Sequence, residues 1–212
     1  MLGAIIGDTV GSVYEFENIK TTEFDLFSPE SIYTDDSVIT LAVAHWLVND
    51  KTYNTQTLVD TIVYFANEYP CPKGGYGDSF LEWLTYPDVW VEEVERDNGT
   101  KGIVFRELRK PYNSWGNGSA MRTSAVGWMF DTLEETERIA ALQAGITHNH
   151  PEGIKGAEAT TVAIYMARTG SNLLEIQDYI NKHYYKIDFK LDDIRADYSF
   201  DVSCEFNSSQ QS

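Results

Sequence analysis

Three consecutive residues, Thr34, Asp35 and Asp36, place one hydroxyl group and two carboxylates directly before a long apolar run. This pattern is typical of a helix start, because Thr is a common N-cap residue and carboxylates in the first turn interact favourably with the helix dipole. The second interpretation is a metal site. A helix as apolar as the one that follows predicts a buried N-terminus, where two carboxylates are costly without a partner. A hard cation such as Mg²⁺ or Ca²⁺ is a suitable partner.

Two more carboxylates, Asp8 and Glu15, belong to an N-terminal segment in which Gly3, Gly7 and Gly11 recur every four residues. On a helix this spacing puts the three glycines on one face, where another backbone can approach closely. Helix packing therefore explains the glycines without any function. The functional interpretation is that Asp8 and Glu15 lie near the same ligand as the acidic pair described above, with Asp8 supporting the residues that touch it.

A glycine-rich turn, Gly116–Gly118, precedes a predicted helix start at Ser119. Free N–H groups at a helix start suit a phosphate group. The segment is not a P-loop, because the Lys-Ser/Thr ending is absent. A simple turn followed by a helix cap explains the same residues equally well.

Two histidines, His148 and His150, lie directly before Pro151. They do not indicate a zinc site, because no third soft ligand lies nearby in the sequence. As loop residues they suit stacking on a base or a sugar. The small residues between Gly153 and Ala163 predict a helix that packs closely against its neighbours.

The elements that must position these residues are predicted to be helices. Leu58, Ile62 and Phe65 mark one apolar face, Thr132 is a plausible N-cap, and Pro151 suits a first helical position. Residues 70–77 and 111–118 are predicted loops, 101–110 shows no clear pattern, and the chain from about 188 reads as strand-like or irregular. Helices are predicted over residues 3–13, 35–49, 55–68, 78–86, 88–96, 119–128, 133–145, 151–169 and 172–184. Without βαβ alternation, these elements indicate a mostly α fold.

The composition limits the partners. The 212 residues include 33 acidic and 16 basic side chains, and the formal net charge is −17. This charge repels nucleic-acid backbones and anionic membranes and attracts divalent cations. Two cysteines do not form a disulfide framework, and the sequence has neither a positively charged leader nor an apolar run of about 18 residues. We therefore expect a soluble cytoplasmic protein.

Four stretches together resemble the ADP-ribosylglycohydrolase family, of the dinitrogenase-reductase-activating glycohydrolase type. They are "GAIIGDTVGSVYEF", "YTDDSVITLAVAHWL", "SWGNGSAMRTSAVGW" and "THNHPEGIKGAEATTVAIYMAR", in the family's order and rough spacing, and "FDVSCEF" near residue 200 continues the match. The resemblance implies one domain over residues 1–206 and a polar tail at 207–212. It also implies a compact all-α orthogonal bundle of many helices.

The resemblance implies an activity and a set of site residues as well. The family hydrolyses the bond between C1 of the distal ribose of ADP-ribose and an acceptor such as arginine or serine, with two Mg²⁺ or Mn²⁺ ions. Its ligands are ADP-ribose or ADP-ribosylated proteins. By position, Thr34, Asp35 and Asp36 match the metal motif, and Asp36, Asp35 and Glu15 are the expected catalytic residues. The expected substrate-binding residues are Asp8, Asn117, Gly118, Ser119, Met121, His148 and Glu152.

One family motif is absent from the 212 residues. Family members usually continue past the "VSC" segment to a Gly-Gly-Asp-x-Asp-Thr motif that supplies further metal ligands, whereas this chain stops at Ser212. From this we expect one bound ion or none, and impaired turnover. The alternatives are an ADP-ribose-binding module without catalysis and a split or scaffold relative whose uncovered face is completed by a second chain. Acidic residues between Asp192 and Asp201 are not expected to substitute as ligands.

Overall fold

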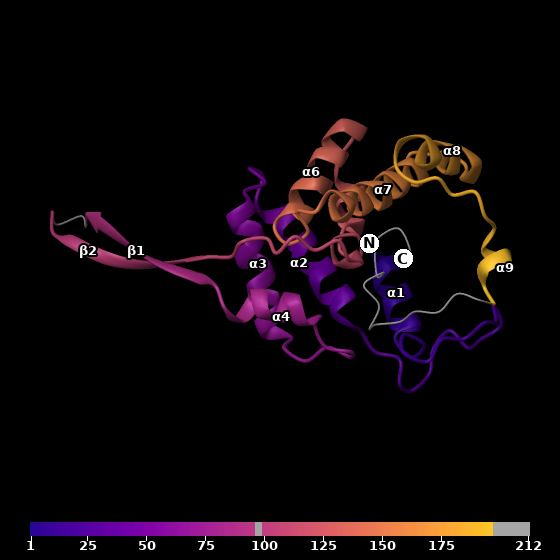
Figure 1. Cartoon of the computed structure of the whole chain (residues 1–212), viewed down its shortest axis with the longest axis horizontal. Coiled ribbons are helices and arrows are strands. Elements are labelled where there is room, and N and C mark those ends of the chain that lie inside the picture. The colour runs from indigo at the N-terminus through magenta and orange to yellow at the C-terminus, as the bar shows by residue number, and fades with distance from the viewer. Residues whose placement is uncertain (96–98, 197–212) are drawn as a thin grey trace.

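The computed structural model describes residues 1–95 and 99–196 and is mostly helical, as the sequence predicts (Figure 1). A single two-stranded antiparallel hairpin interrupts the helices of this described part. The elements are, in chain order, α1 (Leu2–Gly11), α2 (Asp35–Asn49), α3 (Thr55–Glu68), α4 (Asp78–Thr85), β1 (Asp88–Glu95), β2 (Lys101–Leu108), the 3₁₀ turn η1 (Asn117–Ser119), α5 (Ser124–Met129), α6 (Leu133–Gly145), α7 (Pro151–Arg168), α8 (Leu173–His183) and α9 (Leu191–Ile194).

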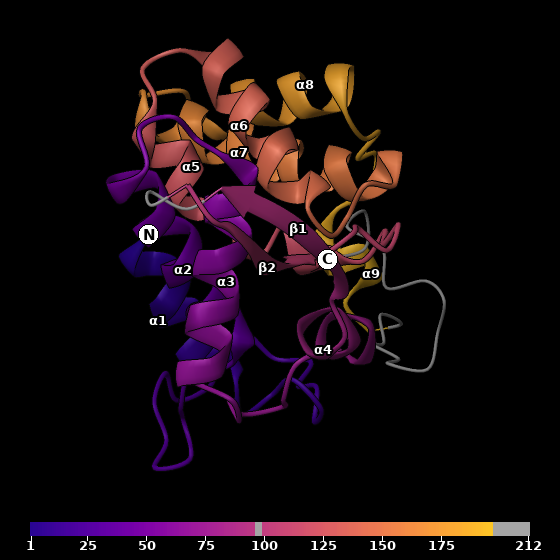
Figure 2. The same ribbon diagram turned by 90° about the vertical axis from the view of Figure 1, so that its left-hand side faces the viewer.

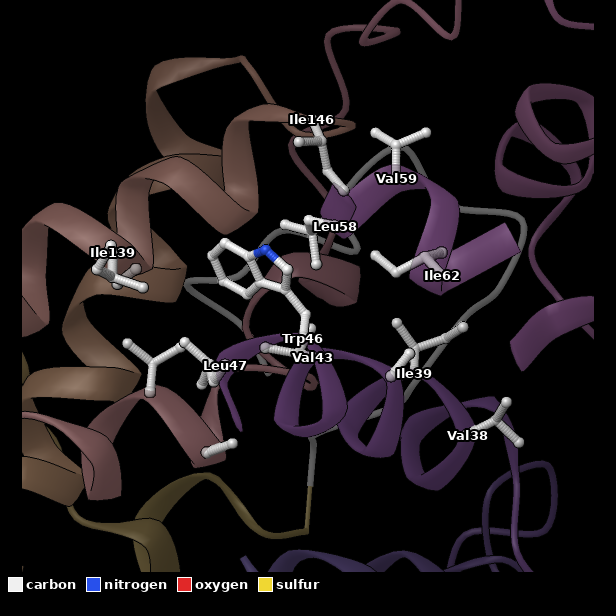
Figure 3. Packing of buried hydrophobic residues seen from close by; sticks show 14 of the residues in the cluster. Val38, Ile39, Val43, Trp46, Leu47, Leu58, Val59, Ile62, Ile139 and Ile146 are labelled. Carbon is white, nitrogen blue, oxygen red and sulfur yellow. The ribbon is translucent and has the colours of Figure 1, made fainter. Parts of the chain in front are cut away.

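Helix α2 forms the centre of the larger hydrophobic core and packs against α1, α3 and α5. Figure 3 shows the indole of Trp46 pointing from α2 into the space between Leu58 and Ile139. All three side chains are fully buried. Although its sequence is strongly apolar, α2 is not buried all round: Leu41 is 38% exposed and Val48 is 63% exposed.

Helices α6, α7 and α8 form a layer at the top of both whole-chain views (Figures 1 and 2). Their ends lie where the sequence signals predict. The Thr132 hydroxyl accepts a hydrogen bond from the backbone N–H of Glu135 and caps α6, and Pro151 occupies the first position of α7. Asn172 and Glu175 form a capping box at the start of α8. These caps satisfy backbone groups that have no partner within the helix.

The segment predicted as a helix over residues 88–96 is instead strand β1, and the unassigned residues after it form strand β2. The two strands pair antiparallel, with Val91 opposite Phe105, and project away from the helices (Figure 1). In "DVWVEEVE", Trp90 and Val94 lie four residues apart, as on a helix face, whereas Val89 and Val91 lie two apart, as on a strand face. The pairing partner decides the outcome, and local spacing does not reveal it.

Two further sequence expectations were wrong. The helix predicted from Ser119 starts at Ser124, because residues 117–119 first form a 3₁₀ turn. The glycine face of α1 is open: a Cβ atom on Gly3, Gly7 or Gly11 would meet nothing within 4 Å among the described residues.

None of the described helices is both long and apolar enough to cross a bilayer. The polar tail and the "FDVSCEF" stretch lie outside the described residues.

Candidate functional site

A cavity of about 740 Å³ lies where α1, the start of α2, the start of α4 and the loop before α5 meet. Most of the site residues predicted from the sequence line it. The predicted residues in its lining are Asp8, Glu15, Thr34, Asp35, Asp36, Asn117, Gly118, Met121 and His148. Segments more than 100 residues apart in the sequence therefore contribute to one cavity.

Asp8 fixes the start of α2 through both of its carboxylate oxygens. Its Oδ2 accepts hydrogen bonds from the backbone N–H of Thr34 (2.9 Å) and from the Ser37 hydroxyl, and its Oδ1 accepts from the Thr34 hydroxyl (2.6 Å). Thr34 also caps α2, because its Oγ1 accepts from the backbone N–H of Asp36. The helix-cap interpretation of this segment is therefore confirmed. Asp8 is committed to hydrogen bonds that position the acidic pair.

The acidic residues of the cavity lining, which form its acidic wall, raise one another's pKa. Burial, followed by the neighbouring charges of Asp36 and Glu15, raises the pKa of Asp35 to about 7. Burial likewise raises the pKa of Asp36 to about 6, with contributions from Asp8 and Glu15. The pKa of Glu15 is raised mainly by burial and then by Asp8, while Lys73 lowers it. Such a cluster is costly to ionise and favours binding of a cation.

Two observations on the same wall fit a hard divalent cation. The Oε2 atom of Glu15 is buried and has no hydrogen-bond partner among the described residues. The Thr34 hydroxyl donates to Asp8 and accepts from Asp36, which leaves one oxygen lone pair for a ligand. Carboxylate and hydroxyl oxygens are the donors that Mg²⁺ prefers. No three His, Cys, Asp or Glu side chains within residues 1–95 and 99–196 are grouped to hold an ion as they stand, so the carboxylates would have to converge on it.

The loop of residues 112–116, which also lines the cavity, is held in place by the segment that leads into α7. The backbone N–H of Tyr112 donates to the Thr147 carbonyl (3.3 Å), and that of Asn113 donates to the Asn149 side chain (2.8 Å). A Cβ atom on Gly153 would lie 2.6 Å from the carbonyl oxygen of Ser114, so only glycine permits this approach. The loop is thus fixed to the helical layer.

The expectation of free N–H groups behind the glycine-rich turn was wrong for two residues. The N–H groups of Ala120 and Met121 both donate to the Asn117 carbonyl, at 2.8 and 3.0 Å. These two N–H groups are therefore not offered to a phosphate. What Gly118 offers is space, because a Cβ atom there would lie 3.1 Å from two atoms of the His148 ring.

Two predicted substrate-binding residues lie outside the cavity lining. Ser119 is fully buried and its hydroxyl donates to the Gly153 carbonyl (2.7 Å). Glu152 lies in the first turn of α7, 3.5 Å from the Lys155 ammonium group. In this arrangement Ser119 joins the loop to α7, and Glu152 interacts with its own helix.

Sequence reasoning missed a buried polar network beside the cavity. Arg122 lines the cavity and is 1% exposed. Its guanidinium donates from Nε to the Gln143 side chain (2.7 Å), and from Nη2 to the Gln143 carbonyl (2.7 Å) and the Thr147 hydroxyl (2.9 Å). Thr147 Oγ1 lies 2.8 Å from Nδ1 of His148. The one available signal was a lone arginine among the small and apolar residues of "SAMRTSAVGW".

Comparison with known proteins identifies the family to which this chain belongs. The sequence matches the ADP-ribosylglycohydrolase family model over residues 1–206, and the chain belongs to this family. ADP-ribosylhydrolase ARH3 of Bos taurus is 29% identical over 195 residues, which cover 82% of this chain and 50% of that protein. ADP-ribosylhydrolase ARH3 of Mus musculus is 28% identical over 190 residues, which cover 80% of this chain and 48% of that protein. The chain thus spans about half the length of the curated relatives it matches.

Proposed function

We propose that residues 1–206 act as one ADP-ribosylglycohydrolase-like domain that binds ADP-ribose in the cavity and hydrolyses its bond to a modified acceptor such as arginine or serine. The observation that carries this proposal is one cavity with two chemically different walls, in a chain that belongs to the family. Asp8, Glu15, Asp35 and Asp36 form the acidic wall, and Arg122 lies in another part of the same lining.

The charge distribution supports a ligand with an anionic part and a hydroxyl-rich part. With a net charge of −17, the protein repels a diphosphate unless a local feature attracts it. Arg122 is such a feature, because no carboxylate in the described part of the chain forms an ion pair with it. A buried cation without an anionic partner favours a negatively charged ligand nearby.

The acidic wall suits the reacting end of the ligand. Thr34, Asp35 and Asp36 would hold Mg²⁺ or Mn²⁺, which supplies Lewis-acid stabilisation of the ribose hydroxyls when bound. Asp8 keeps the Thr34 hydroxyl and the first turn of α2 in position. Glu15 lies outside the Thr34–Asp36 metal motif, and its Oε2 atom, which has no hydrogen-bond partner among the described residues, would take a proton from the attacking water. The acceptor leaves from an oxocarbenium-like ribose carbon, as in other glycoside hydrolyses.

Turnover tests this proposal. The 212-residue chain is incubated with peptides that carry ADP-ribosyl-arginine or ADP-ribosyl-serine, with Mg²⁺ or with EDTA, and released ADP-ribose is measured. We expect Mg²⁺-dependent release that falls at least 100-fold in Glu15→Gln, because one positioned proton acceptor contributes about 10²–10⁴ in rate. Asp60→Asn is the control: it replaces an exposed carboxylate on α3 by an amide and should leave release unchanged.

A second function, ADP-ribose binding without hydrolysis, is supported by the position of the Arg122 network. Its contacts to Gln143 and Thr147 involve no carboxylate, so binding at this wall does not require the acidic wall. ADP-ribose binding combined with no release from either peptide, with or without Mg²⁺, would favour this function and contradict catalysis.

A further inference from the structure

We propose that Thr147 and Arg122 are positioning residues that fix His148 in the tautomer with its proton on Nε2, and that this N–H is presented to an acceptor oxygen of the ligand beside Gly118. The tautomer follows from contacts within the chain. The assignment of a ligand oxygen rests on the proposed function, with a phosphate oxygen of a nucleoside diphosphate as the acceptor that fits best.

The tautomer follows from counting hydrogens at the Thr147 hydroxyl. Arg122 Nη2 lies 2.9 Å from Thr147 Oγ1, and a guanidinium group can only donate. The hydroxyl oxygen therefore accepts from Arg122, and among the described residues its single hydrogen has no acceptor other than His148 Nδ1, at 2.8 Å. When Nδ1 accepts this hydrogen, the proton of the neutral imidazole resides on Nε2.

The guanidinium that sets this direction cannot rotate without losing other bonds. Arg122 donates to both the side chain and the carbonyl of Gln143. The Gln143 amide in turn donates to the Ser119 carbonyl (3.0 Å), which fixes which of its ends faces Arg122. All of these partners are buried. Breaking one bond leaves a buried polar group unsatisfied, so the network has one stable orientation.

The same environment keeps the His148 ring neutral. Burial and, to a smaller extent, the positive charge of Arg122 together lower the pKa of His148 to about 3. The other ring against it is Tyr112, whose pKa burial raises to about 12, so its hydroxyl is neutral as well. The imidazole is therefore a neutral donor whose one N–H direction is set by Thr147.

The Nε2 edge of the ring is directed at Gly118, a residue of the cavity lining. A Cβ atom built on Gly118 would lie 3.1 Å from both Nε2 and Cε1 of His148, so this edge is directed at the glycine. Gly118 and His148 both line the cavity, together with Arg122. A ligand oxygen next to Gly118 would accept the Nε2 hydrogen bond within reach of the Arg122 charge. An anionic oxygen gains from both, which favours a phosphate group.

The ¹⁵N chemical shifts of the histidine rings test the tautomer without any ligand. In uniformly labelled protein, His148 should show a protonated Nε2 and an unprotonated Nδ1 throughout pH 5–8; His148→Gln assigns its signals. Thr147→Val should produce a mixture of both tautomers, whereas Thr147→Ser, which keeps the hydroxyl, should preserve the wild-type pattern. Thr160→Val, which removes a hydroxyl bonded within α7, is the matched control. A wild-type ring protonated on Nδ1, or one that becomes doubly protonated above pH 5, would overturn the inference.

ADP-ribose affinity tests the positioning role. We expect Thr147→Val to weaken binding about tenfold, the effect of one hydrogen bond to a charged group, and Thr147→Ser to bind like wild type. Equal affinities of wild type and Thr147→Val would overturn the positioning role. If wild type binds no ADP-ribose, the proposed function fails together with the ligand assignment, while the NMR result alone decides the tautomer.

Discussion

Replacing Asp35 by Asn should stabilise the metal-free protein while removing its response to Mg²⁺. The Asp35 carboxylate is half-buried beside Asp36 and Glu15, and this raises its pKa from 3.8 to about 7. Because the folded-state pKa lies above the unfolded one, the protonated carboxyl favours folding. That contribution is complete below about pH 4 and is lost as the pH rises through 7.

The size of the effect follows from the same pKa. A rise from 3.8 to about 7, at 1.36 kcal/mol per pKa unit, corresponds to about 4 kcal/mol of folding free energy lost at pH 8. Asn removes the charge with little change in shape. Since the Asp36 carboxylate contributes part of the repulsion and relaxes in the variant, we expect a gain of about 2–4 kcal/mol at pH 8. At pH 5 the folded wild-type carboxyl is protonated, and the gain should fall to less than half.

Urea unfolding of wild type and Asp35→Asn at pH 8 and pH 5, with EDTA, measures these differences. Addition of 10 mM Mg²⁺ at pH 8 should raise the free energy of unfolding of wild type but not of the variant, because the ion binds only the intact carboxylates of the folded state. Asp60→Asn should behave like wild type throughout. A variant that is no more stable than wild type at pH 8, or one with the same gain at pH 5, would refute the electrostatic reasoning.

Three further substitutions test the packing around the site. Gly153→Ala should lower the free energy of unfolding by about 1–3 kcal/mol and weaken ADP-ribose binding, because its Cβ atom would lie 2.6 Å from the Ser114 carbonyl oxygen and push it away. Chemical denaturation measures the first effect and calorimetry the second. Gly127→Ala, whose Cβ atom would lie 2.7 Å from Ile164, should cost a similar amount of stability and leave ligand affinity unchanged in the folded protein. Thr132→Ala should cost about 1 kcal/mol in urea unfolding through loss of the α6 cap, with unchanged binding.

The helices with strong end signals were predictable from the sequence. The residue types of Thr132 and Pro151 set helix boundaries through local hydrogen bonding and a fixed φ, and α6 and α7 begin where these residues indicate. The hairpin was not predictable in the same way. Val91 and Phe105 become neighbours only through pairing between strands, and the residue spacing within one strand does not predict which segment it pairs with.

The candidate site was predictable where motifs mark it and not where the fold assembles it. Asp35 and Asp36 draw attention as adjacent carboxylates, and the cavity brings them near Asp8 as expected. Arg122 and Thr147 could not be recognised in the sequence, because a single arginine and a single threonine form no motif. Their role depends on burial and on hydrogen bonds across 21 to 25 residues of sequence. Those contacts exist only once α6 and α7 pack beside the loop.

The most direct test of the central claim is a calorimetric titration of the 212-residue chain with ADP-ribose, with and without Mg²⁺, beside Asp35→Ala. Binding in wild type that strengthens with Mg²⁺, and an Asp35→Ala variant that binds ADP-ribose with no Mg²⁺ effect, is the result that the two-walled cavity predicts. No heat in wild type under either condition, or an unchanged Mg²⁺ effect in Asp35→Ala, would contradict the assignment of this cavity as a metal-assisted ADP-ribose site.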